Sequence, residues 1–332
     1  MSSHLNFDFS GTPAVLRDPG SRLAPAEGDP LVSVIIPCYN GEAFLKETIE
    51  SALAQNYQRV EVIVVDDGST DGSADIAQAY PVRYIRQPNR GLTASRNLGI
   101  RESTGSYVVF LDADDRLLPE AIEIGLRVLS QRPECAMTVG DHLFVSADGF
   151  YLASSRKPCL HSSHYEALLK SNFIEMISSV LFRRSIFDEV GDFNTELRVA
   201  EDYELYLRIA RDHAICCHPA VVAEYRLHQS NVSHNSELML TMTLRVLKSQ
   251  TQFIRNPGRL FAFLEGIRRW RKQYGRQLAS ELARSFTTLQ INHLRRKILL
   301  LAAQYPQGLM MLLLLRIAPK LSSARNRAAA RA

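Results

Sequence analysis

The order of apolar and polar positions predicts alternating strands and helices in the first half of the chain. Short β-branched apolar runs are typical of buried strands, whereas apolar residues three or four positions apart are typical of helices. We expect strands at 32–37, 60–65, 82–85, 107–111 and 136–145, and helices at 42–55, 73–80, 93–100 and 119–130. This alternation favours an α/β fold with a doubly wound, mainly parallel sheet flanked by helices and joined by right-handed crossovers.

The pattern is less regular after residue 150. A helix is expected at 164–171, and an apolar run follows at 176–182. The segment 201–210 has helical spacing with acidic residues in its first turn, where they favour the helix dipole. A last strand is expected at 221–225. These elements suggest that a less regular second half completes the same folded body.

Charge divides the chain near residue 236. From Glu237 to Ala332 there are 18 Lys or Arg and 3 Asp or Glu, a net charge of +15, and the rest of the chain carries −11, which gives +4 overall. We therefore expect a flexible lead-in over 1–30, a folded body over 31–236, and a basic, largely helical C-terminal extension over 237–332.

Composition adds little that is specific. With 332 residues, 46% of them hydrophobic and 22% charged, the chain is typical of a globular protein with one large domain, or with one domain and an appendage. None of the five cysteines forms a Cys-x-x-Cys motif, and Cys216 and Cys217 are adjacent, a poor geometry for a mutual disulfide. We expect reduced thiols and a cytoplasmic location. The N-terminus lacks the basic start and apolar run of a signal peptide.

Two acidic clusters follow predicted strands. Asp66 and Asp67 come directly after one apolar run, and Asp112, Asp114 and Asp115 come after another. Carboxylates at the carboxyl ends of parallel strands lie at the edge where such sheets bind ligands. The two clusters therefore suggest a nucleotide and a divalent cation bound side by side. Solvated turns or helix caps are the alternative interpretation of each cluster.

Six motifs in order resemble those of family 2 glycosyltransferases, and together they cover roughly residues 31–235. They are Val32 to Asn40, Val64 to Asp71, Asn89 to Asn97, Phe110 to Asp115, Glu201 with Asp202, and Tyr225 to His228. The resemblance implies that the body, 31–236, is a catalytic domain with a GT-A-type fold. It also implies a nucleotide-diphosphate sugar donor, a Mg²⁺ or Mn²⁺ ion, and inversion at the anomeric carbon.

The resemblance assigns the metal side of the site. Asp114 would be the direct metal ligand, and Asp112 would contact the ribose or the water shell of the metal. His228 would complete the metal or diphosphate shell, or else lie on the surface. Both ions favour oxygen ligands and usually take one or two carboxylates, which leaves positions for phosphate and water.

The resemblance also assigns the nucleotide side. Asp67 first, and Asp66 second, would face the nucleobase, where a carboxylate can accept the N3–H of uracil. Tyr39 could stack on the base, and main-chain groups around Pro37 could reach it. Arg96 would add positive charge near the diphosphate or lie on the surface.

Glu201 and Asp202 are the candidates for proton transfer. An acceptor hydroxyl has a very high pKa and needs a nearby carboxylate to take its proton as the new bond forms. The resemblance gives that role to Asp202, with Glu201 orienting it or contacting the acceptor. The alternative is that both acids only complement the dipole of the helix that they begin.

Two other functions compete with a hexosyl transfer from a nucleotide sugar. A nucleotidyltransferase should carry a glycine-rich loop with a nearby lysine after its first strand, but 37–41 holds one glycine and the next lysine is Lys46. A non-catalytic nucleotide-sugar binding subunit would not need Asp202. The donor is expected to be UDP-linked, and the acceptor to be a glycan or a lipid-linked sugar in cell-surface polysaccharide or glycolipid synthesis.

The basic extension leaves two interpretations open. Its apolar runs at 298–303 and 309–315 are each too short to span a bilayer. Basic helices with an apolar face suit the anionic inner face of the cell membrane, and they would equally pack on the acidic body or on a partner protein. Nucleic acid is not expected, because no reader motif accompanies the basic runs.

Overall fold

The computed structural model describes residues 28–155, 163–229, 231, 235–285 and 294–310. Almost all of the expected lead-in over 1–30 lies outside the described residues, as does the second of the two apolar runs in the extension, apart from its first two residues.

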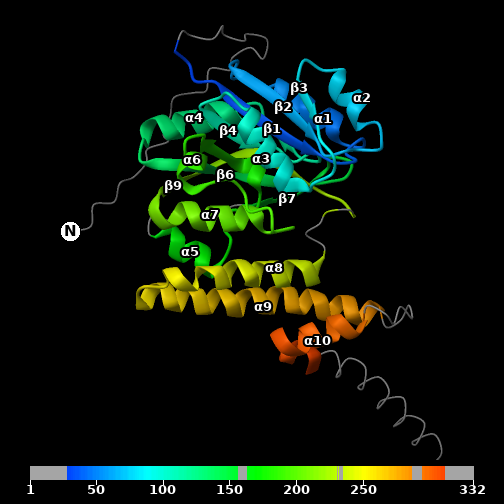
Figure 1. Ribbon diagram of the computed structural model, residues 1–332, viewed down its shortest axis with the longest axis vertical. Coiled ribbons are helices and arrows are strands. Elements are labelled where there is room, and N and C mark those ends of the chain that lie inside the picture. Colours follow the sequence, from blue (N-terminus) through cyan, green and yellow to red (C-terminus); the bar gives the residue numbers. More distant parts are fainter. Residues whose placement is uncertain (1–27, 156–162, 230, 232–234, 286–293, 311–332) are drawn as a thin grey trace, which may run out of the picture.

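The first half of the body is the alternating structure that the sequence predicts. Its strands are β1 (Val32–Cys38), β2 (Val60–Asp66), β3 (Arg83–Arg86) and β4 (Tyr107–Phe110), and its helices are α1 (Leu45–Leu53), α2 (Ser73–Gln78), α3 (Leu92–Glu102) and α4 (Ala121–Gln131). The strands lie in the order β3-β2-β1-β4, and all of them are parallel. The carboxyl ends of β1, β2 and β4 therefore meet at one edge (Figure 1).

The second half continues the sheet with mixed strand directions. It contributes β5 (Arg116–Leu117), β6 (Cys135–Ser146), β7 (Tyr151–Ser155), β8 (Val180–Arg183) and β9 (Ala214–Leu227), with α5 (His164–Lys170), a 3₁₀ turn η1 (Ile177–Ser179), α6 (Ile186–Val190) and α7 (Glu201–Asp212). The order runs on from β4 as β8-β6-β9-β5, with β7 beside β6. Strand β8 is antiparallel to β4 and β6, whereas β6 and β9 are parallel. The expected fold class is confirmed, and the parallel arrangement is strongest in the first half.

The sequence missed the short elements β5, β7 and α6. Strand β5 has two residues and α6 has five, too few for a period to be recognised. Most of β7 is exposed, so it lacks the apolar alternation that identifies a strand. Each of these elements depends on a tertiary partner.

Both faces of the sheet are buried. On one face, Ile35 and Val108 join a core cluster that includes Leu205 of α7. On the other face, Val34 and Val109 join a second cluster with α1, α2 and α4. Residues that alternate along a strand point to opposite faces, so burial on both sides explains why these strands are continuously apolar.

The extension packs on the body. Its helices are α8 (Ser236–Ser249), a 3₁₀ turn η3 (Gln250–Phe253), α9 (Pro257–Ser285) and α10 (Leu294–Gln304). In Figure 1, α8 and α9 lie under α5 and α7. Trp270 of α9 sets its ring edge-to-face on Tyr203 of α7, 5.8 Å between centroids. Helices α8 and α9 therefore share the larger core cluster of the body.

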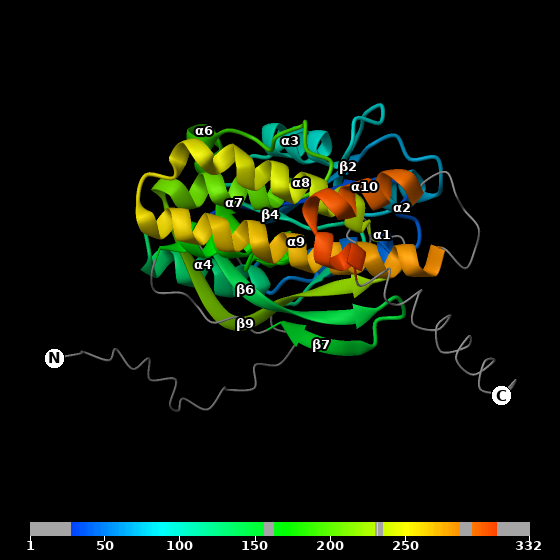
Figure 2. The ribbon, with the colours of Figure 1, turned by 90° about the horizontal axis from the view of Figure 1, so that it is seen from below.

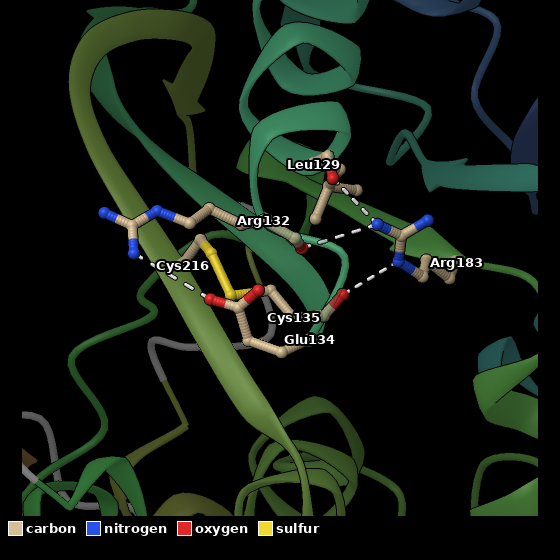
Figure 3. Close-up of a disulfide and its surroundings, with 6 residues drawn as sticks. All are labelled: Leu129, Arg132, Glu134, Cys135, Arg183 and Cys216. Carbon is tan, nitrogen blue, oxygen red and sulfur yellow. Dashed lines mark hydrogen bonds and ion pairs between the residues drawn. A yellow bond between two sulfur atoms is a disulfide. The ribbon is translucent and has the colours of Figure 1, made fainter.

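The expectation of reduced thiols is wrong for two of the cysteines. Cys135 of β6 and Cys216 of β9 form a disulfide with Cα atoms 5.9 Å apart (Figure 3). The two residues lie 81 positions apart in the sequence, and the parallel pairing of β6 with β9 brings them together. Spacing along the sequence gives no sign of this pair. Arg183 braces the same corner by donating to the carbonyls of Leu129 and Cys135.

Candidate functional site

Asp66 ends β2 and is buried. Its carboxylate accepts the backbone N–H of Ser69 at 2.8 Å and the hydroxyl of Tyr84 at 2.6 Å. Burial would raise the pKa of Asp66, but these hydrogen bonds hold the pKa below its usual value. Asp66 therefore stays ionised while its oxygens are engaged by its own chain.

Asp67 is equally engaged. One carboxylate oxygen accepts from the side chain of Gln87 at 2.7 Å and from the backbone N–H of Arg90 at 2.9 Å, and the other accepts from Gly91 N–H at 2.7 Å. Gly91 has φ +90° and caps the start of α3, a conformation that glycine adopts without strain. The residue predicted to read the nucleobase thus also fixes the segment that leads into α3.

The predicted base-contacting residues of β1 lie beside these acids. Pro37 and Cys38 pair with Val65 and Asp66 across the sheet. Pro37 lies beyond the last residue of β1 that pairs with β4, where a strand tolerates the missing N–H. Tyr39 follows, with 53% of its surface exposed. A large exposed ring next to the end of β2 is available to stack on a planar ligand.

The second acidic cluster forms a loop after β4. Asp114 lies 2.8 Å from Nε2 of His228, which follows β9, and the His228 ring stacks on Phe44. Burial, with the nearby charge of Asp112, raises the pKa of Asp114, while His228 opposes that rise. The structure therefore brings together two predicted metal-side residues that are far apart in the sequence.

Asp115 has a structural partner set. It is buried and accepts the backbone N–H of Arg226 at 3.1 Å and the hydroxyl of Ser178 at 3.3 Å. Burial first, and Asp114 second, raise the pKa of Asp115 well above its usual value. Asp115 thus joins the acidic loop to β9 rather than to the helix that follows it.

Sequence reasoning missed Arg226. Its side chain is buried, donates to the carbonyl of Asp114 at 3.0 Å and to Glu47 at 2.7 Å, and lies over the ring of Phe44. Arg226 thus fixes the backbone of the acidic loop. The available signal was its place in the motif that ends at His228.

The donor set at Asp114 fits a hard divalent ion. A carboxylate and an imidazole converge there, and Asp112 lies on the same loop. Among the described residues no three or more His, Cys, Asp or Glu are arranged to hold a metal. Mg²⁺ and Mn²⁺ commonly take only one or two carboxylates and complete their shell with water and substrate phosphate, so a two-donor site suits them.

Arg96 lies at the centre of the site, with only 2% of its surface exposed. Its guanidinium donates to Glu201 at 2.5 Å and to Asp112 at 2.6 Å. Burial works to lower the pKa of Arg96, but Asp112 and Glu201 outweigh it and raise the pKa. The residue predicted to meet the diphosphate thus bridges the acidic loop to the start of α7.

Asp202 is the second residue of α7, directly after Glu201. Its carboxylate accepts the N–H of Tyr203 at 2.7 Å. Burial first, and the charge of Glu201 second, raise the pKa of Asp202 to about 7, although Arg96 opposes the rise. A carboxylate with a near-neutral pKa can take up and release a proton at physiological pH.

Contacts connect several of the predicted residues. Arg96 contacts Asp112 and Glu201, and its charge also acts on Asp202. Asp67 reaches α3, the helix that carries Arg96, by accepting the backbone N–H of Gly91, which is the N-cap of that helix. The site therefore lies at the carboxyl ends of the parallel strands, closed on one side by α7.

Known proteins resemble this chain in sequence. The family model described as glycosyl transferase family 2 matches residues 33–191. An uncharacterised glycosyltransferase of Rickettsia typhi is 30% identical over 286 residues, which are 79% of this chain and 86% of the relative. One of Rickettsia felis is also 30% identical, over 63% of this chain and 37% of that longer relative.

Solved structures share the fold. TarS of S. aureus, residues 1–349 in complex with UDP-GlcNAc, aligns with a TM-score of 0.55 and 19% identity over 86% of this chain and 81% of that chain. The mannosyltransferase PcManGT of Pyrobaculum calidifontis, in complex with GDP-Man and Mn²⁺, aligns with a TM-score of 0.56 and 20% identity over 88% of this chain and 82% of that chain. At these identities the likeness establishes the fold.

Proposed function

The chain belongs to glycosyl transferase family 2, and from this premise we propose that it is an inverting, metal-dependent glycosyltransferase. It would transfer a sugar from a nucleotide-diphosphate donor, UDP-linked, to an acceptor hydroxyl. The observation that carries the proposal is the chain of contacts from Asp112 through Arg96 to Glu201, beside Asp202. It sets a carboxylate with a near-neutral pKa next to an acidic loop suited to a divalent ion.

The donor side follows from the acidic loop. Asp114 and His228 would hold the divalent ion, with Asp112 contacting the ribose or the water shell of the metal. When bound, such an ion neutralises the charge that develops on a diphosphate leaving group. The complexes of PcManGT with GDP-Man and Mn²⁺ and of TarS with UDP-GlcNAc support this class of donor.

The nucleotide side supports a uridine donor. Tyr39 offers an exposed ring for stacking. Asp67 and Asp66 would present carboxylate oxygens to the N3–H of uracil, in competition with the hydrogen bonds that they accept from their own chain. Arg96 would act on the diphosphate through its charge, because its guanidinium already contacts two carboxylates.

The acceptor side follows from α7. Asp202 would take the proton of the acceptor hydroxyl while that oxygen attacks the anomeric carbon and the bond to the diphosphate breaks. A single displacement with base and leaving group on opposite faces of the sugar inverts the anomeric configuration. Glu201, fixed by Arg96, would keep Asp202 in place and hold its pKa near neutrality.

We place the reaction in the synthesis of a cell-surface polysaccharide or glycolipid, with a glycan or lipid-linked acceptor. A cytoplasmic enzyme at the inner face of the cell membrane would suit such an acceptor. The support is the basic composition of the extension, whose 18 Lys or Arg against 3 Asp or Glu suit an anionic membrane surface.

A donor screen tests the proposal. The full-length protein is incubated with UDP-, GDP- and other nucleotide sugars and Mn²⁺, and free nucleotide is measured. We expect release from a UDP-sugar, loss of release with EDTA, and recovery with Mn²⁺ or Mg²⁺. NMR of the product should show an anomeric configuration opposite to that of the donor. Retention of configuration, or full activity in EDTA, would overturn the mechanism.

A further inference from the structure

The outer face of α9 combines apolar and basic side chains. Phe261 and Leu264 have 61% and 56% of their surface exposed. At helical spacing, the same stripe continues through Arg268, Lys272 and Arg276, and all three are exposed. These five residues are called the α9 outer face below.

Helix α10 extends this surface. Leu299 of α10 and Met310, which lies beyond the end of that helix, have 61% and 63% of their surface exposed, and Arg295 and Arg296 of α10 are also exposed. Figure 2 looks at the molecule from below, with α10 lying over the second half of α9 and the first half of α9 left uncovered. The two helices therefore lie next to each other on this side of the molecule (Figure 2).

Among the basic residues of these two helices, Arg296 of α10 pairs with Glu237 of α8 at 2.7 Å. The opposite side of α9 already packs inward, with Ala262 and Trp270 in the core. Within the part of the chain that the structure describes, no acidic side chain forms an ion pair with Arg268, Lys272 or Arg276. Glu265 is exposed on the same side of α9, where it pairs with Lys170 of α5, and the three basic residues of the α9 outer face leave a net positive charge beside the exposed apolar groups.

We propose that the α9 outer face docks on the surface of a bilayer that contains anionic phospholipid. A helix with apolar and basic groups on one face lies in the headgroup region, where Phe261 and Leu264 would enter the acyl boundary and the basic groups would meet lipid phosphates. In the described part of the chain, no helix is long and apolar enough to cross a membrane. The protein would therefore lie on the membrane through this face.

Docking here would orient the proposed active site. Trp270, on the inner side of α9, contacts Tyr203, the residue directly after Asp202. The hydroxyl of Tyr203 also donates to the carbonyl of Leu168 in α5 at 2.6 Å. The membrane-facing helix is thus rigidly connected to α7, which holds the proposed base. This inference deepens the proposed function by placing the acceptor at a lipid surface, but the docking itself needs no sugar transfer.

Vesicle co-sedimentation tests the proposal with the full-length protein. Vesicles of phosphatidylcholine alone are compared with vesicles that also contain phosphatidylglycerol, at low and high salt. We expect strong binding only to the anionic vesicles, weakened by salt. Combined replacement of Arg268, Lys272 and Arg276 by Gln should weaken binding about a hundredfold, since each basic residue near an anionic surface contributes about fivefold.

Two controls match these changes elsewhere on the surface. Replacement of Arg101, Arg127 and Arg132 by Gln removes the same charge from α3, α4 and the α4 C-cap, and should leave vesicle binding within about threefold. Phe261→Ser with Leu264→Ser should weaken binding at least about tenfold, because it removes the inserting groups. The control variant is Phe150→Ser with Leu152→Ser, which changes an exposed residue of the β6–β7 turn and an exposed residue of β7. It should not weaken vesicle binding.

Two outcomes would overturn the proposal. If the α9 and control charge variants bind equally, the attraction comes from net charge rather than from this face. If sedimentation equilibrium shows a dimer that the Phe261→Ser/Leu264→Ser variant abolishes, while vesicle binding is unchanged, the face joins two copies of the chain. Neither measurement depends on donor turnover, so the docking can fail while the proposed transferase activity stands, and the reverse.

Discussion

The acids at the end of β2 differ from those of the β4 loop and α7. Asp66 accepts two hydrogen bonds, and its pKa is lowered. Asp202 accepts one hydrogen bond and lies beside another carboxylate, and its pKa is raised to about 7. Asp114 lies between these cases, since His228 offsets part of the effect of burial.

The difference separates two uses of a carboxylate. Hydrogen bonds from the backbone stabilise the ionised form of a carboxyl group, and its oxygens then hold a loop in place. Burial next to like charge keeps a carboxylate poised to gain a proton, at a cost in stability. The acids of the first region therefore hold a loop, and the second region keeps an acid that can exchange a proton near neutral pH.

The largest test of this comparison is Asp202→Asn. The amide keeps the shape of the carboxylate but cannot take a proton, so we expect kcat to fall by about 10²–10⁴. Donor affinity, measured by calorimetry, should stay within about twofold. Asp212→Asn, at the other end of α7, is the matched control and should keep full activity. Normal turnover by Asp202→Asn would remove α7 from the chemistry.

The second test concerns Arg96, which connects the β4 loop to α7. Arg96→Met leaves Asp112 and Glu201 close together without the cation between them, so we expect a loss of about 3–5 kcal/mol in the free energy of unfolding, measured in urea. Arg101→Met, an exposed residue on the same helix, should cost under about 1 kcal/mol.

The double variant Arg96→Met/Glu201→Gln keeps the test decisive if Arg96→Met alone does not fold. Removing one of the two carboxylates relieves the repulsion and should restore part of the lost stability. Equal unfolding free energies for Arg96→Met and Arg101→Met would show that the bridge contributes nothing, and that the two regions are held together by packing.

The third test is the pH dependence of turnover. Asp202 must be ionised to accept a proton, and its pKa is raised to about 7. We therefore expect kcat/KM to fall about tenfold for each unit below pH 7 and to level off above it. Glu201→Gln removes the neighbouring negative charge, lowers the pKa of Asp202, and should move this limb to lower pH. A profile that is flat from pH 5 to 8 would contradict the assignment.

Much of this arrangement was predictable because it is local. The strands β1, β2 and β4 are continuous apolar runs, and each is followed directly by the acids or the aromatic residue of the site. Their parallel pairing brings those strand ends together. The hydrophobic pattern and the order of the strands were therefore enough to expect Asp66, Asp67 and Asp112 at one edge of the sheet.

The remainder depends on contacts between distant segments. Arg226 reaches the backbone of Asp114 across 112 positions, and Arg96 reaches Glu201 across 105. The disulfide of Cys135 arises from the pairing of β6 with β9, which no local pattern encodes. A buried arginine and an exposed one look alike in a sequence, because burial is decided by the partner acids.

The smallest expected effect tests the first region. In Asp67→Asn one side-chain oxygen still accepts a hydrogen bond, but the amide NH₂ faces a backbone N–H of Arg90 or Gly91, so about 1–3 kcal/mol should be lost from the free energy of unfolding. Asp75→Asn, exposed on α2, is the control and should change little. If Asp67→Asn instead weakens UDP binding in calorimetry without loss of stability, its carboxylate serves the nucleobase more than the loop. The contrast between loop-holding and reactive acids would then fail for Asp67, because its hydrogen bonds to the chain would be expendable and its oxygens would be free to exchange them for the ligand.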